Sequence, residues 1–573
     1  MAETLISPGV LAQENDNSFI APAPLAAGAA IIGPTVKGPA VQPTVVTSFG
    51  EYSNIFGTTL EAGGTTQEYL TSLAVKSYFN QGGDSVLVTR VISGSSTDIT
   101  AAEDSGITAA DAGAVPFTLK TIGKGAIMNS SSSLNSDGSL QSGSSDNLRW
   151  EISNIDSSQG TFSLSIRRGD DNTKNKAILE SFNDLSLDPN NSRYIEKVIG
   201  NQTKSVVAEG AETYISTTGE YPNISNYVVV GSVARKTLNY LSTDGVTIRE
   251  GSLSGSIPTA QSGTFTGATY SNPDGSFNGD IDNTDTQGIS DFSSYTEAIS
   301  ILNNQDEYVF NIVSAPGLVY ENATHATHID SIISLAESRG DAIAVVDAVN
   351  YGSTVNAAAA GVASLNSSYA ANYWPWLQMQ SAGRSVWVPA SVVIPGVYAF
   401  TDGASAPWFA PAGLTRGGLG DVIQAERKLT RTNRDTLYAK NVNPIATFPG
   451  SGISVFGQKT LQKKKSALDR VNVRRLLIDL KKFLGDTAKT LVFEQNTITT
   501  RNSFLATVNP FLNSVVQRQG LYAFRVVMDE TNNTADVIDR NQLIGQIFIQ
   551  PAKTAEFITL DFTIEPTGAT FTA

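Results

Sequence analysis

The chain has 573 residues, of which 40% are hydrophobic and only 16% are charged, and its formal net charge at pH 7 is −15. An acidic chain repels phosphates, so we expect no nucleic-acid partner. There is no cysteine, which excludes disulfides and sites in which thiolates bind zinc or iron.

The first residues carry neither the basic segment nor the apolar segment of a secretory signal. No apolar run reaches the roughly 18 residues that a membrane span needs. We therefore expect a protein that is assembled in the cytoplasm of the cell that makes it, with no direct insertion into a membrane.

Strand and helix patterns alternate in two separated parts of the chain and predict a layered α/β core. The first part is expected to form a buried strand, two helices and a second strand, over residues 27–40, 47–56, 65–80 and 85–93. Thr47 or Ser48 is the expected N-cap of the first helix.

The second part of the core repeats this alternation. Strand, helix, strand, helix and further strands are expected over residues 307–317, 326–339, 341–348, 353–369 and 385–400. Gly340 is the expected end of the first of these helices, because glycine readily adopts the left-handed conformation of a C-cap.

The intervening residues differ in composition. Tracts rich in Ser, Gly, Asn and Asp at 129–147 and 251–292 flank a β-rich stretch at 148–250. We interpret residues 94–300 as one or more β-rich domains inserted into the core and lying at its surface.

The last part of the chain predicts an α+β domain. A basic segment, residues 458–484, has nine cations and two carboxylates, and its apolar residues have helical spacing. A second helix over 501–520 and strands over 521–529 and 542–551 follow.

The final residues have the period of a half-buried strand, and this strand needs a hydrogen-bonding partner. Its apolar positions alternate with polar ones and are Ile558, Leu560, Phe562 and Ile564. The pattern alone leaves open whether the partner is the chain's own sheet or another molecule.

The fold class expected is α/β in the core and α+β overall. The expected divisions are an N-terminal arm, the first part of the core, the insert, the second part of the core, a C-terminal domain and a C-terminal arm, over residues 1–20, 21–93, 94–300, 301–453, 454–550 and 551–573.

Candidate catalytic chemistry is sparse. His325 and His328, with Asp330 nearby, have a spacing that can hold a metal, but they are the only histidines and no third ligand is evident. The more ordinary interpretation is the start of a helix.

The glycine-rich run at 413–422 lacks the spacing of a nucleotide loop and predicts a tight turn.

Three stretches resemble the tail sheath proteins of contractile-tailed bacteriophages, the T-even type in particular. They are LISPGVLAQE at residues 5–14, APWFAPAGLTRG at 406–417 and the long segment from 526 to 571. The resemblance implies a subunit that polymerises around an inner tail tube and contracts, driving the tube through the host envelope, with no catalysis and no cofactor.

The resemblance also implies partners and a location in the virion. The partners are other copies of the chain, the tail tube protein, and the baseplate and tail terminator proteins. Arms at both ends of the chain would add strands to neighbouring subunits, with the N-terminal contacts at Ser7, Pro8, Gly9 and Val10 and the C-terminal ones at Ile558, Leu560, Phe562 and Ile564.

A helix of the C-terminal domain would line the tube. The basic residues proposed for this contact are Lys463, Lys464, Lys465, Arg470, Arg474, Arg475, Lys481 and Lys482. A solvated helix face is the alternative interpretation of the same charges.

For the whole chain, the alternatives are another self-assembling surface or shell protein, or a metal-dependent hydrolase that uses the two histidines.

Overall fold

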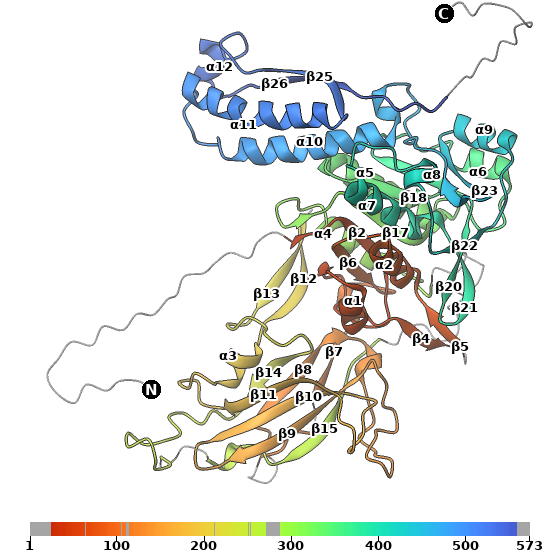
Figure 1. Cartoon of the computed structure of the whole chain (residues 1–573). Helices are drawn as coiled ribbons and strands as arrows, with labels where there is room; N and C mark the ends of the chain where they lie inside the picture. The colour runs from red at the N-terminus through yellow and green to blue at the C-terminus, as the bar shows by residue number, and fades with distance from the viewer. Residues whose placement is uncertain are drawn as a thin grey trace, which may run out of the picture.

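The computed structural model describes residues 25–62, 65–104, 106–109, 114–210, 212–249, 251, 254–270 and 287–557. Within these ranges the molecule has three tiers: the α/β core lies between an inserted β-domain at one end and a helical C-terminal domain at the other (Figure 1). Residues 1–20 and 558–573, on which the predicted arm contacts fall, lie outside the described residues.

The core is built on an eight-stranded sheet to which both predicted parts of the chain contribute. Six central strands are parallel and the two edge strands run antiparallel to them. In spatial order the strands are β24 (Gly452–Val455), β23 (Val442–Phe448), β19 (Ala370–Trp374), β18 (Ile343–Asp347), β17 (Ile312–Val319), β2 (Ala29–Pro34), β6 (Val86–Val91) and β3 (Thr44–Val46).

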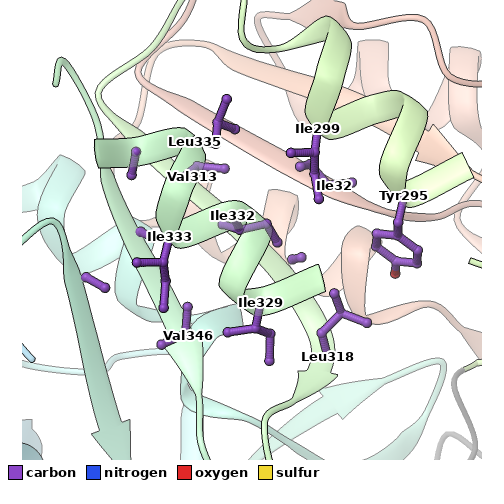
Figure 2. Close-up of a cluster of buried hydrophobic side chains, with 14 of the residues drawn as sticks. Ile32, Tyr295, Ile299, Val313, Leu318, Ile329, Ile332, Ile333, Leu335 and Val346 are labelled. Carbon is purple, nitrogen blue, oxygen red and sulfur yellow. The ribbon is translucent and has the colours of Figure 1, made fainter. Parts of the chain in front are cut away.

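Helices cover both faces of this sheet, so the strands β2, β6, β17, β18 and β19 are buried along their whole length. One face packs against α4 (Ser293–Ile301), α5 (Ala323–Arg339), α6 (Val355–Gly361) and α9 (Arg431–Ala439). The other packs against α1 (Phe49–Phe56), α2 (Leu70–Asn80) and α7 (Ile394–Ala404). Figure 2 shows how isoleucines of α4 and α5 meet side chains of the sheet, such as Val313 and Val346.

The inserted domain contains a seven-stranded antiparallel sheet with its own buried core around Trp150, Phe117 and Phe162. The strand order is β11 (Ile178–Ser186), β10 (Thr161–Arg168), β9 (Leu148–Asp156), β15 (Gln261–Thr266), β7 (Ala101–Asp104), β8 (Phe117–Lys124) and β14 (Val228–Val233), and helix α3 (Ile195–Ile199) packs on it.

Several contacts join the insert to the core, and two of them are extensive or deeply buried. The hairpin of β12 (Thr203–Glu209) and β13 (Glu212–Thr218) reaches back to the core, where Val206 and Ile215 pack against its hydrophobic cluster. The buried guanidinium of Arg90, on β6, donates to the carbonyl of Gly38 in the core at 2.7 Å and to that of Lys124 in the insert at 2.9 Å.

The C-terminal domain consists of α10 (Val471–Lys489), α11 (Ile498–Gln517), α12 (Ala535–Asp539) and a two-stranded sheet of β25 (Leu521–Val527) and β26 (Gln546–Pro551). Residues 456–470, which precede α10, still pack with the core, since Leu461 belongs to its cluster and its N–H donates to Ala370 O at 2.9 Å.

Smaller elements make up the rest of the secondary structure in the described ranges. They are the pair β1 (Leu25–Ala26) and β16 (Tyr308–Val309), the hairpin β4 (Thr59–Ala62) and β5 (Thr65–Glu68), the sheet β21 (Arg384–Val388), β20 (Leu377–Ser381) and β22 (Val422–Ala425), the short helix α8 (Gly413–Arg416), and the 3₁₀ turns η1 (Ser96–Asp98), η2 (Ala126–Met128), η3 (Ser254–Ser256), η4 (Ala390–Val392) and η5 (Ala467–Asp469).

Several local predictions are confirmed. Ser48 caps α1 by accepting a hydrogen bond from the N–H of Glu51, and Gly340 ends α5 in the left-handed conformation. The glycine-rich run at 413–422 forms a turn around α8 rather than a nucleotide loop. No helix within the described ranges combines the length and the apolar character of a bilayer span.

Three local predictions are wrong. The helix expected over 65–80 begins at Leu70, because residues 65–68 pair with β4 as a hairpin. The helix expected over 353–369 ends at Gly361. The strands expected over 385–400 give way after Val388 to the helix α7, whose Pro395 lies in the first turn, where proline is tolerated. This helix is buried along most of its length, so its apolar run has no helical period.

A buried carboxyl group in the core makes stability depend on pH. Burial raises the pKa of Asp347, at the end of β18, to about 7. The N–H of Ser391 donates to its Oδ1 at 3.2 Å, while its Oδ2 has no hydrogen-bond partner among the described residues. The folded protein therefore holds this proton to about pH 7, whereas an unfolded aspartate loses it near pH 4.

The free energy of unfolding should fall as pH rises between these two values and level off above about pH 7. We predict that D347N, which keeps an acceptor for Ser391, removes most of this decline. The measurement is urea unfolding of the unassembled subunit from about pH 5 to pH 8. D435N, at an exposed position on α9, is the control, and an undiminished decline in D347N would contradict the assignment.

Candidate functional site

The C-terminal domain presents a sheet that is covered on one face and open at both edges. Phe524 and Val526 of β25 and Ile547 and Ile549 of β26 pack against the hydrophobic cluster formed with α10 and α11. Among the described residues, β25 and β26 pair only with each other. The N–H and C=O groups along both outer edges can therefore accept additional strands.

The outer face of the same sheet is apolar in part. Phe548, on β26 opposite Arg525, is 57% exposed, and Tyr522 of β25 is 65% exposed. Large exposed aromatic side chains on a sheet whose edges have no neighbouring strand are typical of a surface that another chain covers. The geometry suits strand addition: main-chain groups bind at the edges, and aromatic side chains lie beside them.

The chain leaves this sheet after Pro551 and is fixed again at Glu556. One carboxylate oxygen of Glu556 accepts from Nε of Arg470 at 2.7 Å and from Nε2 of Gln458 at 3.0 Å, and the other accepts from the hydroxyl of Tyr438 at 2.9 Å. Gln458 also donates to Thr554 at 2.6 Å. We call these residues the arm clamp: Tyr438, Gln458, Arg470, Thr554 and Glu556.

Reasoning from the sequence missed the arm clamp. Its members come from α9, from the segment before α10 and from the end of the described chain. No local pattern links a tyrosine, a glutamine and a glutamate that are this far apart in sequence. Only Arg470 was singled out beforehand, and the structure gives it a role within the subunit through Glu556 and Asp469.

The basic residues that were predicted to face a tube divide into three groups by exposure. Those on the surface are Lys463, Lys464, Lys465, Lys481 and Lys482, whereas Arg470 is half-buried in the arm clamp. The remaining two, Arg474 and Arg475, are only 4% and 3% exposed.

The prediction that Arg474 and Arg475 face a tube is therefore wrong, because both side chains are buried within the subunit. Arg474 lies 3.9 Å from the ring centre of Tyr369 and donates to the carbonyl of Ser368, and burial lowers its pKa. Arg475 forms an ion pair with Asp402 and lies over the ring of Tyr398. Both arginines join α10 to the core, a tertiary contact that helical periodicity cannot predict.

The two histidines lie on α5. His325 is buried, its Nδ1 accepts a hydrogen bond from the N–H of Val319 at 3.1 Å, and burial lowers its pKa to about 4. His328 stacks on Phe292 with ring centres 5.2 Å apart. The described part of the chain holds no cluster of three metal-ligating side chains. These contacts are those of a helix packed on the core, as the more ordinary interpretation predicts.

Two stretches of the chain match known families. Residues 290–461 match the phage tail sheath protein central domain, and residues 463–565 match the phage tail sheath C-terminal domain. They include most of the core sheet and the whole described C-terminal domain. The resemblance found from the sequence motifs is thereby confirmed.

Individual proteins show the same relationship. The chain is 44% identical over 188 residues to the tail sheath protein of Vibrio phage KVP40 and 40% identical over 185 residues to that of Enterobacteria phage T4. These alignments cover 33% and 32% of this chain, and the chain spans only 28% of the length of each of these relatives.

A solved structure supports the fold as a whole. The crystal structure of a sheath tail protein from Listeria innocua aligns with a TM-score of 0.52 over 92% of this chain and 95% of that chain. Its sequence identity is 10%, so the likeness concerns the fold alone.

The buried arginine Arg475 should matter for stability, unlike the exposed lysines of the same helix. R475A leaves Asp402 without its cation and removes the group stacked on Tyr398. Breaking a buried pair costs about 3–5 kcal/mol, and because Asp402 is partly exposed we expect about 2 kcal/mol.

The measurement is urea unfolding of the unassembled subunit. K482A is the matched control, and it should change the free energy of unfolding by less than about 0.5 kcal/mol. Equal small effects of both substitutions would show that Arg475 does not join α10 to the core.

Proposed function

Because the chain carries the central and C-terminal domains of phage tail sheath proteins, we propose that it is the structural subunit of a contractile tail sheath. Copies of the chain polymerise around the inner tail tube, and the polymer contracts to drive the tube through the host envelope. The protein works in the virion as a mechanical element, without catalysis, and also contacts the baseplate and the tail terminator.

The open edges of the β25–β26 sheet are the observation that carries this proposal. A sheet of two strands has little stability of its own, and this one gains support on one face from α10 and α11. Strands donated by neighbouring subunits complete it. A contact between unlike surfaces of identical subunits does not close on itself and builds a helical polymer.

The donated strands come from the two ends of the chain. The residues that pair are Ile558, Leu560, Phe562 and Ile564 of the C-terminal arm and Ser7, Pro8, Gly9 and Val10 of the N-terminal arm. Main-chain pairing of this kind survives rotation of the bodies about the flanking segments. The network of arms therefore stays connected while the bodies exchange their other contacts during contraction.

The arrangement of the tiers supports a direction for the subunit in the sheath. The insert and the C-terminal domain lie at opposite ends of the core (Figure 1). In this proposal the C-terminal domain faces the tube and the insert faces outward. The exposed lysines, including Lys481 and Lys482 of α10, supply the tube contact. Exposed ion pairs contribute about 0–1 kcal/mol each, which suits a contact that must release on contraction.

Removing residues 558–573 should abolish polymerisation without unfolding the subunit. A chain that ends at Phe557 keeps the arm clamp and every described element, so its circular dichroism should match that of the full chain and it should still melt cooperatively. Negative-stain electron microscopy should show hollow polymers for the full chain and none for the truncated chain. Polymers of equal length from the truncated chain would contradict strand donation.

Charge reversal on α10 should weaken assembly on the tube. The variant K481E/K482E should lower the amount of sheath that co-sediments with purified tubes severalfold, and the wild-type contact should itself weaken with added salt. The control is K174E/K236E, which changes two exposed lysines of the insert. If both variants bind tubes like the wild type, α10 does not supply this contact.

A further inference from the structure

A cavity of about 910 Å³ lies beside the point where the C-terminal arm leaves the body of the subunit. Its walls come from α6 and the residues after it, from the end of α9, and from residues 459–465. Phe557, the last described residue, also lines it and is 82% exposed.

The lining combines an apolar wall with a cationic rim. Small and aliphatic side chains form the wall: Ala359, Ala363, Val362, Leu365 and Leu461. The charged side chains in the lining are five cations and one carboxylate: Lys440, Lys459, Lys463, Lys465, Arg470 and Asp469. Such a surface suits an apolar segment that carries carboxylates.

Some of these cations are already engaged. Arg470 binds Glu556, Lys459 donates to the carbonyl of Tyr438 at 2.6 Å, and Lys463 donates to the carbonyl of Ala363 at 2.5 Å. Lys440 and Lys465 form no ion pair within the described ranges. They are exposed and available to an incoming carboxylate.

The rest of the chain after Phe557 has the matching chemistry. Residues 558–565 alternate apolar and polar side chains, and the charged residues among 558–573 are Asp561 and Glu565. The arm clamp holds Glu556 beside the cavity, and Phe557 lines it, so the residues that follow are tethered at the cavity. Four extended residues cover about 13 Å, so Asp561 can reach groups up to that distance from Phe557.

We propose that, in the unassembled subunit, this cavity binds the first residues of the chain's own C-terminal arm, 558–565. Apolar side chains of the arm lie on the alanine and leucine wall, and Asp561 and Glu565 approach Lys440 and Lys465. If the proposed function holds, this docking has a consequence for assembly. An arm bound to its own subunit cannot pair with a neighbour until it meets the open sheet edge of a growing sheath.

The chain has no cysteine, so a designed disulfide reports this contact directly. Ala363 lines the cavity, and Leu560 is three residues beyond Phe557. We expect A363C/L560C to form an intramolecular disulfide under mild oxidation of the monomer, seen as loss of both free thiols without a dimer on a non-reducing gel. Free thiols throughout, or disulfides only between chains, would overturn the proposal.

Charge substitutions test whether the disulfide reflects docking or chance contact. Adding K440E/K465E to the cysteine pair should lower the disulfide yield severalfold, whereas adding K174E/K236E should not. Equal disulfide yields would overturn the charge-based docking.

Hydrogen exchange tests the docking without cysteines. Exchange of residues 355–365 and 436–441 should be faster in the chain that ends at Phe557 than in the full chain. No difference would again overturn the proposal.

These results are independent of the test of polymerisation. If the monomer forms the intramolecular disulfide but the full chain makes no polymers, the docking proposal stands and the sheath function is contradicted. If the full chain makes polymers but no intramolecular disulfide forms, the sheath function stands and the docking proposal is contradicted.

Discussion

The hydrogen-bonding groups along the edge of a β-sheet need partners, and in this protein the β25–β26 sheet has two edges without them among the described residues. Its inner face packs on the helices α10 and α11, which leaves the two edges at the surface. In the proposed sheath, strands from neighbouring subunits complete the domain. Polymerisation would then follow from main-chain hydrogen bonding, with side chains at the edges serving mainly to set the register.

The remainder of the molecule keeps this sheet in a fixed position. Six parallel strands between two helical layers form a core with little freedom to deform. Arg474 and Arg475 attach α10 to that core, and Arg90 attaches the insert. Glu556 fixes the point from which the C-terminal arm departs. Contraction, in this account, moves rigid bodies that remain linked by their arms.

The sequence predicts the features that depend on neighbouring residues. The alternation of strands and helices, the cap at Ser48 and the end of α5 at Gly340 all follow from local chemistry. Prediction from the sequence fails where distant residues decide the structure. The helix α7 lacks an amphipathic period because it is buried almost all round, and Arg474 is covered by Tyr369, which precedes β19. The contact partners of Glu556 are equally beyond a local pattern.

Strand donation would be seen directly in a cryo-electron microscopy reconstruction of the polymer formed by the full chain. Additional strands should lie along the edges of the β25–β26 sheet, and the density of at least one of them should connect to residue 557 of a different subunit. A sheet that remains two-stranded in the polymer, or one completed by residues 558–573 of its own chain, would contradict strand donation.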